Sequence, residues 1–253
     1  MAPQPQLKSS QLINELDRLS MANRLDELTI SRFLREAEKI RSADPLGAAM
    51  LAGYLASERC DAAETERQFQ IAMRLAPDVA EIHANFSHRL FALGFLTRAK
   101  DEMLHAHRLA PGNSSMLTEA MDLAGGSSAF GEALQLAEKL RLLGADIENF
   151  RSANLKSLAR YVADYPGIPA EIQRLEPILG EVMRESGQIL AQVKFSILED
   201  EESEWLSGWW EVFAEPGQIA DLNWALALKQ ANFPVDPEIS SRINMMFVSA
   251  PPA

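Results

Sequence analysis

The sequence contains a single cysteine, Cys60, among 253 residues, which excludes an internal disulfide framework and a cysteine-based zinc cluster. No apolar run approaches the roughly 18 residues of a membrane-spanning helix. The first residues lack the apolar stretch of a signal peptide, so we expect a cytoplasmic protein. Lys and Arg number 24 against 36 Asp and Glu, and the formal charge of −12 argues against nucleic acid or an anionic membrane as the main partner.

The sequence also lacks the motifs of the common enzyme classes. It contains no nucleophile elbow, no Rossmann glycine pattern and no P-loop. The run Gly125-Gly126-Ser127-Ser128 has neither the following Lys nor the preceding strand of a phosphate loop, and it indicates a helix–helix connection. Cys60 lies at a predicted hairpin bend, where we expect a free structural thiol. The sequence therefore predicts no enzyme, no cofactor and no metal site.

What the sequence does contain is a globular composition, with 47% hydrophobic and 24% charged residues. Residues 1–8 carry Pro3 and Pro5 without periodicity and are predicted to be a flexible tail. Helical spacing of apolar residues begins near Ser10 and continues to about residue 188. We expect a helical array over residues 9–188 and a small, acidic, tryptophan-rich module over residues 189–253.

The clearest pattern is an internal repeat. The segment Arg74–Pro77 recurs as Arg108–Pro111, a shift of 34 residues, and a weaker third copy places Ala133 on Ala99. Because a two-helix hairpin cannot bury both of its faces alone, successive hairpins are expected to stack, with small residues where the helices approach. The three copies predict helices over Leu46–Glu58 and Ala62–Leu75, Val79–Leu93 and Leu96–Leu109, and Ser115–Ala124 and Ala129–Leu143.

Local signals mark the expected ends of these helices. The first and last residues of Asp61–Glu64 and of Asp78–Glu81 have the spacing of a capping box, although Asp replaces the usual Ser or Thr. Gly94 and the pair Gly125-Gly126 are expected to provide the breaks between the two helices of a hairpin.

These features resemble the tetratricopeptide repeat (TPR) family over Leu46–Ala145, with Leu25–Ala43 as a degenerate leading unit. Two departures stand out. The closing proline of the third copy is replaced by Ala145. At the fourth position, where the family has an aromatic residue, the copies have Ala49, His83 and Leu117. The resemblance implies an α-α superhelix that binds a protein segment.

The resemblance also implies a concave groove lined by the first helix of each repeat. Its positions fall on Met50, Tyr54 and Glu58 in the first copy, Glu81, His88 and Phe91 in the second, and Thr118 and Asp122 in the third. Family members that clamp a peptide carboxylate use Lys, Arg and Asn there, so this apolar and acidic mixture favours an amphipathic helix or a basic segment as partner. The alternative is that these side chains pack against Leu12–Ile40 or the last helices, which leaves no open groove.

All four histidines lie in the second copy, at His83, His88, His105 and His107. The two helices of that hairpin run antiparallel, so His83 is able to approach His105 or His107. A metal site needs three or four convergent ligands, and neither a cysteine nor an HExxH pattern assists here. We expect partly exposed helical histidines rather than ligands.

Beyond Asp146 the helical spacing continues to Tyr165 and resumes at Pro169, with Pro177 expected to kink or split the later helix. Two strands, a helix and a third strand then follow, over Leu190–Leu198, Trp205–Ala214, Pro216–Asn232 and Ile243–Val248. We therefore predict a mainly α protein, a TPR-like α-α superhelix followed by a small C-terminal α/β module with the order strand, strand, helix, strand.

The C-terminal module concentrates acids and tryptophans. Residues 195–253 hold ten acids and two bases, and all four tryptophans lie there. Strand alternation places Trp205 and Trp209 on one face and Trp210 on the other, so one sheet face is expected to keep an exposed aromatic side chain. An acidic rim around aromatic anchors suits a basic partner, and we assign this role to Asp200, Glu201, Glu202, Glu204, Trp205 and Trp209. The alternative is a solvated hairpin with tryptophans buried beneath the helix.

The resulting hypothesis is a non-enzymatic protein–protein interaction adaptor that binds a protein partner with a basic or amphipathic helical segment. A more specific form is a protein that neutralises a basic protein, as an antitoxin or immunity factor does. A structural accessory subunit of a bacterial secretion or defence complex is the alternative. An enzyme with its site in the C-terminal module has the least support.

Overall fold

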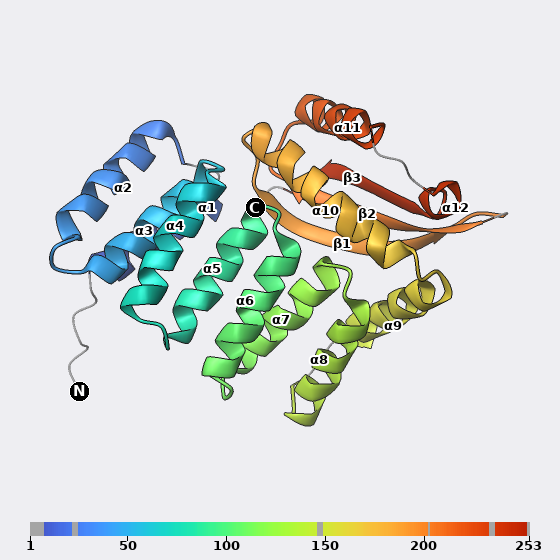
Figure 1. Ribbon diagram of the computed structural model, residues 1–253, viewed down its shortest axis with the longest axis horizontal. Coiled ribbons are helices and arrows are strands. Elements are labelled where there is room, and N and C mark those ends of the chain that lie inside the picture. Colours follow the sequence, from blue (N-terminus) through green and yellow to red (C-terminus); the bar gives the residue numbers. More distant parts are fainter. Residues whose placement is uncertain (1–7, 22–24, 146–148, 202, 233–235, 252–253) are drawn as a thin grey trace.

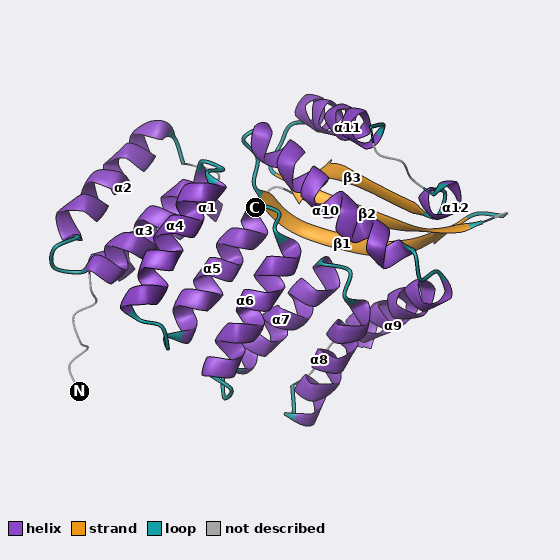
Figure 2. Ribbon diagram, viewed as in Figure 1, coloured by secondary structure: helices purple, strands orange, loops and turns teal. Residues whose placement is uncertain are grey.

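The computed structural model describes residues 8–21, 25–145, 149–201, 203–232 and 236–251. Helices follow one another along the chain, and a small sheet with further helices lies at the C-terminal end (Figures 1 and 2). The helices before the sheet are α1 (Lys8–Met21), α2 (Glu27–Ile40), α3 (Pro45–Glu58), α4 (Ala62–Leu75), α5 (Ala80–Ala92), α6 (Leu96–Leu109), α7 (Ser114–Gly126), α8 (Phe130–Leu142), α9 (Asn149–Asp164) and α10 (Ile168–Glu185). The C-terminal elements are β1 (Leu190–Glu199), β2 (Glu204–Val212), α11 (Pro216–Gln230), α12 (Pro237–Ser240) and β3 (Ile243–Ser249). The protein is therefore mainly α with a small α/β module, as predicted.

The three predicted hairpins, α3–α4, α5–α6 and α7–α8, recur with a spacing of 34 residues. The first helix of each is followed by a residue in the left-handed conformation, with φ of 58° at Cys60, 79° at Gly94 and 60° at Ser128. The next N–H then bonds back to a helical carbonyl at 2.8–2.9 Å, from Asp61 to Ala56, Phe95 to Leu90 and Ala129 to Ala124. These equivalent turns confirm a helical repeat.

Two predictions about helix ends are wrong. Gly125 and Gly126 form the last turn of α7 rather than the break after it, which falls at Ser128. Asp78 does not cap α5, because the helix begins after Val79, where no side chain accepts a capping hydrogen bond. The stacking of the hairpins fixes where each turn falls, so a residue with a β-carbon adopts the left-handed conformation there at a cost of roughly 1–2 kcal/mol.

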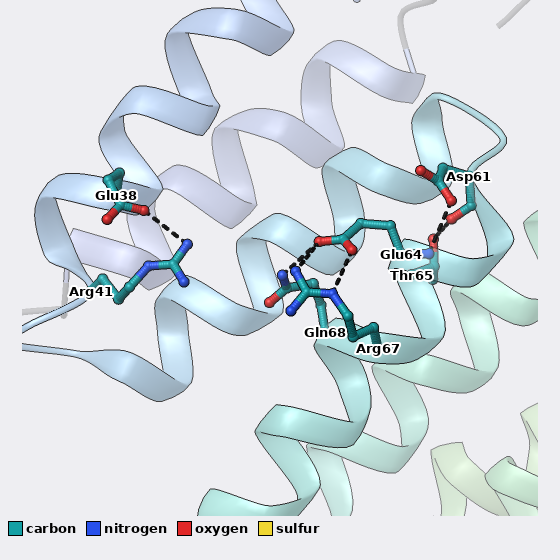
Figure 3. A network of polar contacts seen from close by, with 7 residues as sticks. All are labelled: Glu38, Arg41, Asp61, Glu64, Thr65, Arg67 and Gln68. Atoms are coloured by element: carbon teal, nitrogen blue, oxygen red, sulfur yellow. Dashed lines mark hydrogen bonds and ion pairs between the residues drawn. The ribbon is translucent and has the colours of Figure 1, made fainter.

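The start of α4 shows a polar cap of the predicted kind, although only one of the two hydrogen bonds of a capping box is present. Asp61 Oδ1 accepts a hydrogen bond from the Glu64 N–H at 2.9 Å, and Thr65 Oγ1 donates to the Asp61 carbonyl at 2.7 Å (Figure 3). The Glu64 carboxylate turns instead to Arg67 and Gln68. The Asp61 side chain still satisfies one of the N–H groups that every helix start leaves without a partner.

Small residues lie where the hairpins stack, as the repeat requires. Four alanines of the second helices are fully buried, Ala72, Ala99, Ala106 and Ala133. Gly53 of α3 faces Phe69 of α4, and a β-carbon on Gly53 would lie 2.8 Å from the Phe69 ring. Phe69 in turn stacks on Phe86 of the next hairpin at 5.0 Å between ring centres. Close backbone approach and aromatic filling thus alternate along the array.

Helices α9 and α10 connect the array to the sheet. Tyr161 of α9 donates its hydroxyl to the carbonyls of Arg242 at 3.1 Å and Glu204 at 3.3 Å, which lie at the starts of β3 and β2. Helix α10 runs continuously through Pro177, so this proline does not split the helix, and the alternative that it kinks the helix stays a prediction. Leu175 and Ile178, on either side of Pro177, are both buried, and this packing offsets the lost hydrogen bond.

The sheet has the strand order β1-β2-β3, with β1 antiparallel and β3 parallel to β2. The register pairs Val193 with Trp210 and Trp210 with Phe247, and Trp210 is fully buried. Trp205 and Trp209 lie on the opposite face of β2 and are half-buried. The predicted alternation of the tryptophans is therefore confirmed. Helix α10 runs across the sheet, and α11 lies beside β3 (Figure 1).

One hydrophobic cluster extends from the array into the module. It includes Leu96 of α6 and Phe130 of α8 together with Phe195 of β1 and Trp210 of β2. The Phe130 and Phe195 rings meet edge to face at 5.3 Å. The two parts of the chain thus share a core across residue 188, and the domain boundary placed there stays a prediction.

The turn at Gly94 packs tightly against α10. A β-carbon on Gly94 would lie 3.0 Å from the Gly180 Cα and 3.0 Å from the Trp210 ring. Arg184 of α10 donates to the Leu93 carbonyl beside it. Glycine at position 94 therefore serves two purposes, the left-handed turn and the close contact.

Helix α10 also supplies the N-terminal cap of α6. The start of α6 lacks a side-chain cap of its own, since Phe95 precedes it. Glu176 of α10 accepts hydrogen bonds from the Thr97 N–H at 3.0 Å and from the Thr97 hydroxyl at 2.9 Å. A carboxylate at a helix N-terminus is favoured both by these bonds and by the helix dipole.

Replacement of Gly94 by Ala tests the contact with α10. Gly144 is the matched control, because its φ is also positive (81°) but a β-carbon there would meet nothing within 4 Å. We expect Gly144→Ala to lower the free energy of unfolding by about 1 kcal/mol and Gly94→Ala by about 3 kcal/mol, measured by chemical denaturation. Equal losses would contradict a tight contact at Gly94.

Replacement of Glu176 by Ala tests the cap that α10 supplies. We expect a loss of about 1–2 kcal/mol in the free energy of unfolding, because Thr97 loses both acceptors. Gln173→Ala, at an exposed position of the same helix, is expected to change stability by no more than about 0.5 kcal/mol. Similar losses in the two variants would show that Glu176 contributes no cap.

Candidate functional site

The predicted groove residues of the first hairpin lie largely inside the array. Tyr54 is 3% exposed and donates its hydroxyl to Asn85 Oδ1 at 2.8 Å. The Arg89 guanidinium lies 4.5 Å from the centre of the Tyr54 ring and pairs with the buried Glu58 carboxylate at 3.2 Å. Met50 is half-buried against the same hydrophobic cluster, to which α1 also contributes. These contacts join the first hairpin to the second and leave little surface for a partner.

A hollow lies further along the array, beside predicted groove residues of the second and third hairpins. A pocket of about 360 Å³ lies between α5, α7, α8, α9 and β1, at the lower end of the range for ligand pockets. Three predicted groove residues line it, namely His88 and Phe91 from α5 and Asp122 from α7. Glu81 lies on the exposed surface of α5 and Thr118 is half-buried on α7, both outside this lining.

The pocket combines an apolar interior with a few polar groups. Its larger apolar side chains are Phe91, Met121, Phe130, Leu155, Leu158 and Phe195. Its polar side chains are His88, Glu119, Asp122, Asn154, Gln192 and Lys194. Lys194 of β1 is paired with Glu211, and Glu119 of α7 bonds His88. The acids that the array contributes to the lining are Glu119 and Asp122. An apolar anchor next to a cationic group is the chemistry that such a lining accommodates.

Gly125 and Gly126, which we interpreted as a connection, lie in helical conformation and line the pocket. A β-carbon on Gly125 would lie 3.6 Å from Leu155, and one on Gly126 would lie 3.8 Å from Val193. These are ordinary contact distances, so alanine fits at both positions, and each replacement is expected to strengthen the last turn of the helix by up to about 1 kcal/mol. The two glycines thus lower helix stability and widen the pocket.

A hydrogen-bonded pair lies at the pocket wall. His88 Nε2 and Glu119 Oε2 are 2.6 Å apart, and the Ser115 hydroxyl donates to the other Glu119 oxygen at 3.0 Å. The hydrogen bond from the His88 ring lowers the pKa of the Glu119 carboxyl, and partial burial opposes this effect. Glu119 therefore stays ionised to lower pH than an isolated glutamate.

The acidic hairpin lies apart from the pocket. Asp200, Glu201 and Glu204 are exposed, while Glu202 lies outside the described residues. At the strand rise of about 3.4 Å per residue, Asp200 is about 17 Å from Phe195 along β1. Trp205 is the nearer of the two half-buried tryptophans to this turn. Most predicted site residues therefore fall into three groups, in the array interior, at the pocket and at the β1–β2 hairpin, while Glu81 lies on the exposed surface of α5 and Trp209 in the middle of β2.

A further exposed aromatic residue lies on α11. Trp224 is 68% exposed and Leu228, one helical turn later, is 53% exposed. The opposite face of the helix holds the buried Leu222 and Leu226. Sequence reasoning did not single out Trp224, although its offset of two residues from Leu222 places it on another side of the helix.

The histidines and the cysteine match their expected roles in part. His83 stacks on His105 at 4.3 Å and bonds Glu102 at 2.8 Å through Nδ1. His83 and His107 are buried rather than partly exposed, because they face the stacked helices. Among the described residues no cluster of His, Cys, Asp or Glu has a metal-binding arrangement. Burial raises the pKa of the Cys60 thiol, which makes this thiol a poor nucleophile.

No model of a known protein family matches this chain, and a search of curated proteins finds no similar sequence. Within the described residues, every helix is too short or too polar to cross a membrane.

The Glu119 pair predicts a pH dependence of stability. The folded pKa of Glu119 lies below the usual 4.5, so its contribution is present above that pH and is lost as pH falls through the folded pKa. We expect Glu119→Gln to reduce the free energy of unfolding near neutral pH and to match the wild type in strong acid. Denaturation across this range, with Glu81→Gln as the control at an exposed acid, measures the difference. A pH-independent loss would contradict the assignment.

Proposed function

We propose that the protein is a non-enzymatic protein–protein interaction adaptor of the cytoplasm, with a TPR-like array. The observation that supports this most directly is the pocket between the second and third hairpins. Residues that a TPR-like array uses to bind segments, His88, Phe91 and Asp122, line it. The apolar interior suits an anchor side chain of a partner, and the acids suit a basic residue beside it.

The charge of the whole chain supports a basic partner. The net charge of −12 steers a cationic protein toward the array and raises its association rate at low ionic strength. The exposed hairpin acids offer a second contact about 17 Å from the pocket along β1. A partner that spans both surfaces gains from having two linked contacts. Neutralisation of a basic protein is the specific form that this arrangement favours.

The exposed face of α11 favours a second candidate, a structural accessory subunit of a larger complex. Trp224 and Leu228 give this helix an apolar outer side, which a neighbouring subunit would cover. In that case binding is expected to persist at high salt and to be lost in Trp224→Ala, whereas an acidic contact weakens as salt rises.

Two variants test the adaptor function by affinity capture from an extract of the source cell. Reversal of Asp200, Glu201, Glu202 and Glu204 to Lys is expected to abolish capture of a basic partner at low salt. Gly125→Ala combined with Gly126→Ala is expected to raise the thermal stability and to weaken capture at least tenfold, because the pocket narrows while the helix improves.

The control for the β1–β2 hairpin variant reverses four exposed acids of the array to Lys, which gives the same change in net charge. These acids are Glu38, Asp78, Asp101 and Glu138. This control is expected to retain most of the capture. Unchanged capture by both the β1–β2 hairpin variant and the pocket variant would overturn the proposal. Equal loss in the hairpin variant and in this control would assign binding to net charge rather than to the predicted surfaces.

A further inference from the structure

Strand β1 is an edge strand whose outward backbone groups are identifiable from the register. Asp200 donates its N–H to the Ser203 carbonyl at 2.9 Å, which closes the hairpin with β2. Antiparallel pairing alternates, so the even-numbered residues of β1 bond to β2 and the odd-numbered residues point to the free edge. Val193, Phe195 and Ile197 therefore direct their N–H and C=O groups away from the sheet.

A side-chain contact supports this assignment independently. Asn154 of α9 donates through Nδ2 to the Phe195 carbonyl at 3.3 Å, from the side opposite to β2. Across the part of the chain that the structure describes, the N–H groups of Val193, Phe195 and Ile197 donate to no other backbone group. Asn154 thus contacts this edge at the Phe195 carbonyl, while the N–H groups of Val193, Phe195 and Ile197 have no backbone acceptor among the described residues.

The other edge of the sheet is protected more completely. Asn223 of α11 accepts from the Phe247 N–H at 2.9 Å and donates to the Phe247 carbonyl at 2.9 Å. Both backbone groups of that β3 residue are satisfied, as a neighbouring strand would satisfy them. At β1 the side-chain amide of Asn154 donates to the Phe195 carbonyl and does not accept from the Phe195 N–H.

The pocket borders this free edge rather than one face of the sheet. Four consecutive β1 residues line it, Gln192, Val193, Lys194 and Phe195, although successive side chains point to opposite faces. A cavity over one face would be lined by alternate residues. The unpaired backbone of β1 and the apolar interior of the pocket are therefore accessible to the same ligand.

We propose that an extended peptide segment of the partner pairs with the free edge of β1 as a fourth strand. This inference rests on the proposed adaptor function and names the conformation of its ligand. Alternate side chains of the peptide enter the pocket beside Phe91 and Phe130, and a Lys or Arg lies opposite Asp122 and Glu119. The backbone pairing supplies affinity, and the pocket and acids supply the selection of sequence.

The free backbone groups of β1 favour a strand over a helix. A helix pairs its own N–H and C=O groups internally, so it would leave those of Val193, Phe195 and Ile197 without partners. A paired strand lies about 4.8 Å from its neighbour and inserts every second side chain. This revises the expectation of an amphipathic helical ligand in favour of the basic segment.

The first experiment selects ligands from a displayed library of random short linear peptides with the full-length protein. We expect the selected sequences to carry alternating apolar residues and at least one Lys or Arg. Asp122→Lys is expected to weaken a selected peptide about tenfold, and Asp78→Lys, the same charge change at an exposed loop position, is expected to leave its affinity within about twofold. Recovery of no peptide that depends on Asp122 would overturn the proposal.

Backbone methylation then distinguishes a strand from other bound forms. Methylation of every second peptide nitrogen is expected to weaken binding about tenfold or more, because those N–H groups pair with β1, while methylation of the intervening nitrogens has little effect. In parallel, amide hydrogen exchange at Val193, Phe195 and Ile197 is expected to slow on binding, with no change at Lys194 and Ser196. Methylation effects without a period of two, or unchanged exchange at Phe195, would overturn the paired strand.

The outcomes separate this inference from the proposed function. If the pocket variant Gly125→Ala with Gly126→Ala loses the captured partner but the exchange at β1 is unchanged, the adaptor function stands and the strand pairing is wrong. If neither a captured partner nor a selected peptide depends on the pocket, both are wrong.

Discussion

The approach of the Gly94 turn to helix α10 is the contact on which the rest of the arrangement depends. A β-carbon has no room between Gly94, Gly180 and Trp210, and the same turn presents the Leu93 carbonyl to Arg184. Glu176 caps α6 from the same helix. These bonds hold α10 against the open ends of the hairpins, and α10 in turn lies across the sheet (Figure 1). The position of β1 relative to α5 and α7, and hence the pocket, follows from this docking.

The pocket lies in an array that other elements cover at its two ends, α1 at the first hairpin and α9 with β1 at the third. Helix α1 packs with the first hairpin and buries Tyr54 in a shared cluster. At the third hairpin, α9 and β1 face the groove and leave a space where α7 has two glycines in place of side chains. A repeat array of three hairpins thus gains a bounded site from the elements that cap it, since its ends must be covered in any case.

The sequence predicts the elements well and the site less well, for a physical reason. Helix bounds follow from local signals such as Asp61 and Gly94, and the strand alternation of Trp209 and Trp210 follows from the pleat. The predicted groove face placed His88, Phe91 and Asp122 at the pocket. Asn154 and Gln192 had no such signal, because their proximity depends on how α9 and β1 dock. Gly125 did have a sequence signal, since it lies three residues after Asp122 and therefore on the same helical face. The capping role of Glu176 could not be predicted, because a cap supplied by another helix has no fixed spacing in the sequence.

The pairing of β3 with β2 has a consequence for how the chain folds during synthesis. The hairpins make contacts within about one repeat, so they are able to form in turn as they leave the ribosome. The sheet is completed last, because β3 is its last strand in the chain, and Tyr161 of α9 bonds the Arg242 carbonyl at the start of β3, 81 residues later in the chain. Until β3 arrives, β2 has an unpaired side next to the apolar Trp210 and Leu206. We therefore expect the nascent protein to pass through a stage with a folded array and an incomplete sheet that exposes apolar residues, and we expect the acids of the β1–β2 turn to oppose self-association at that stage.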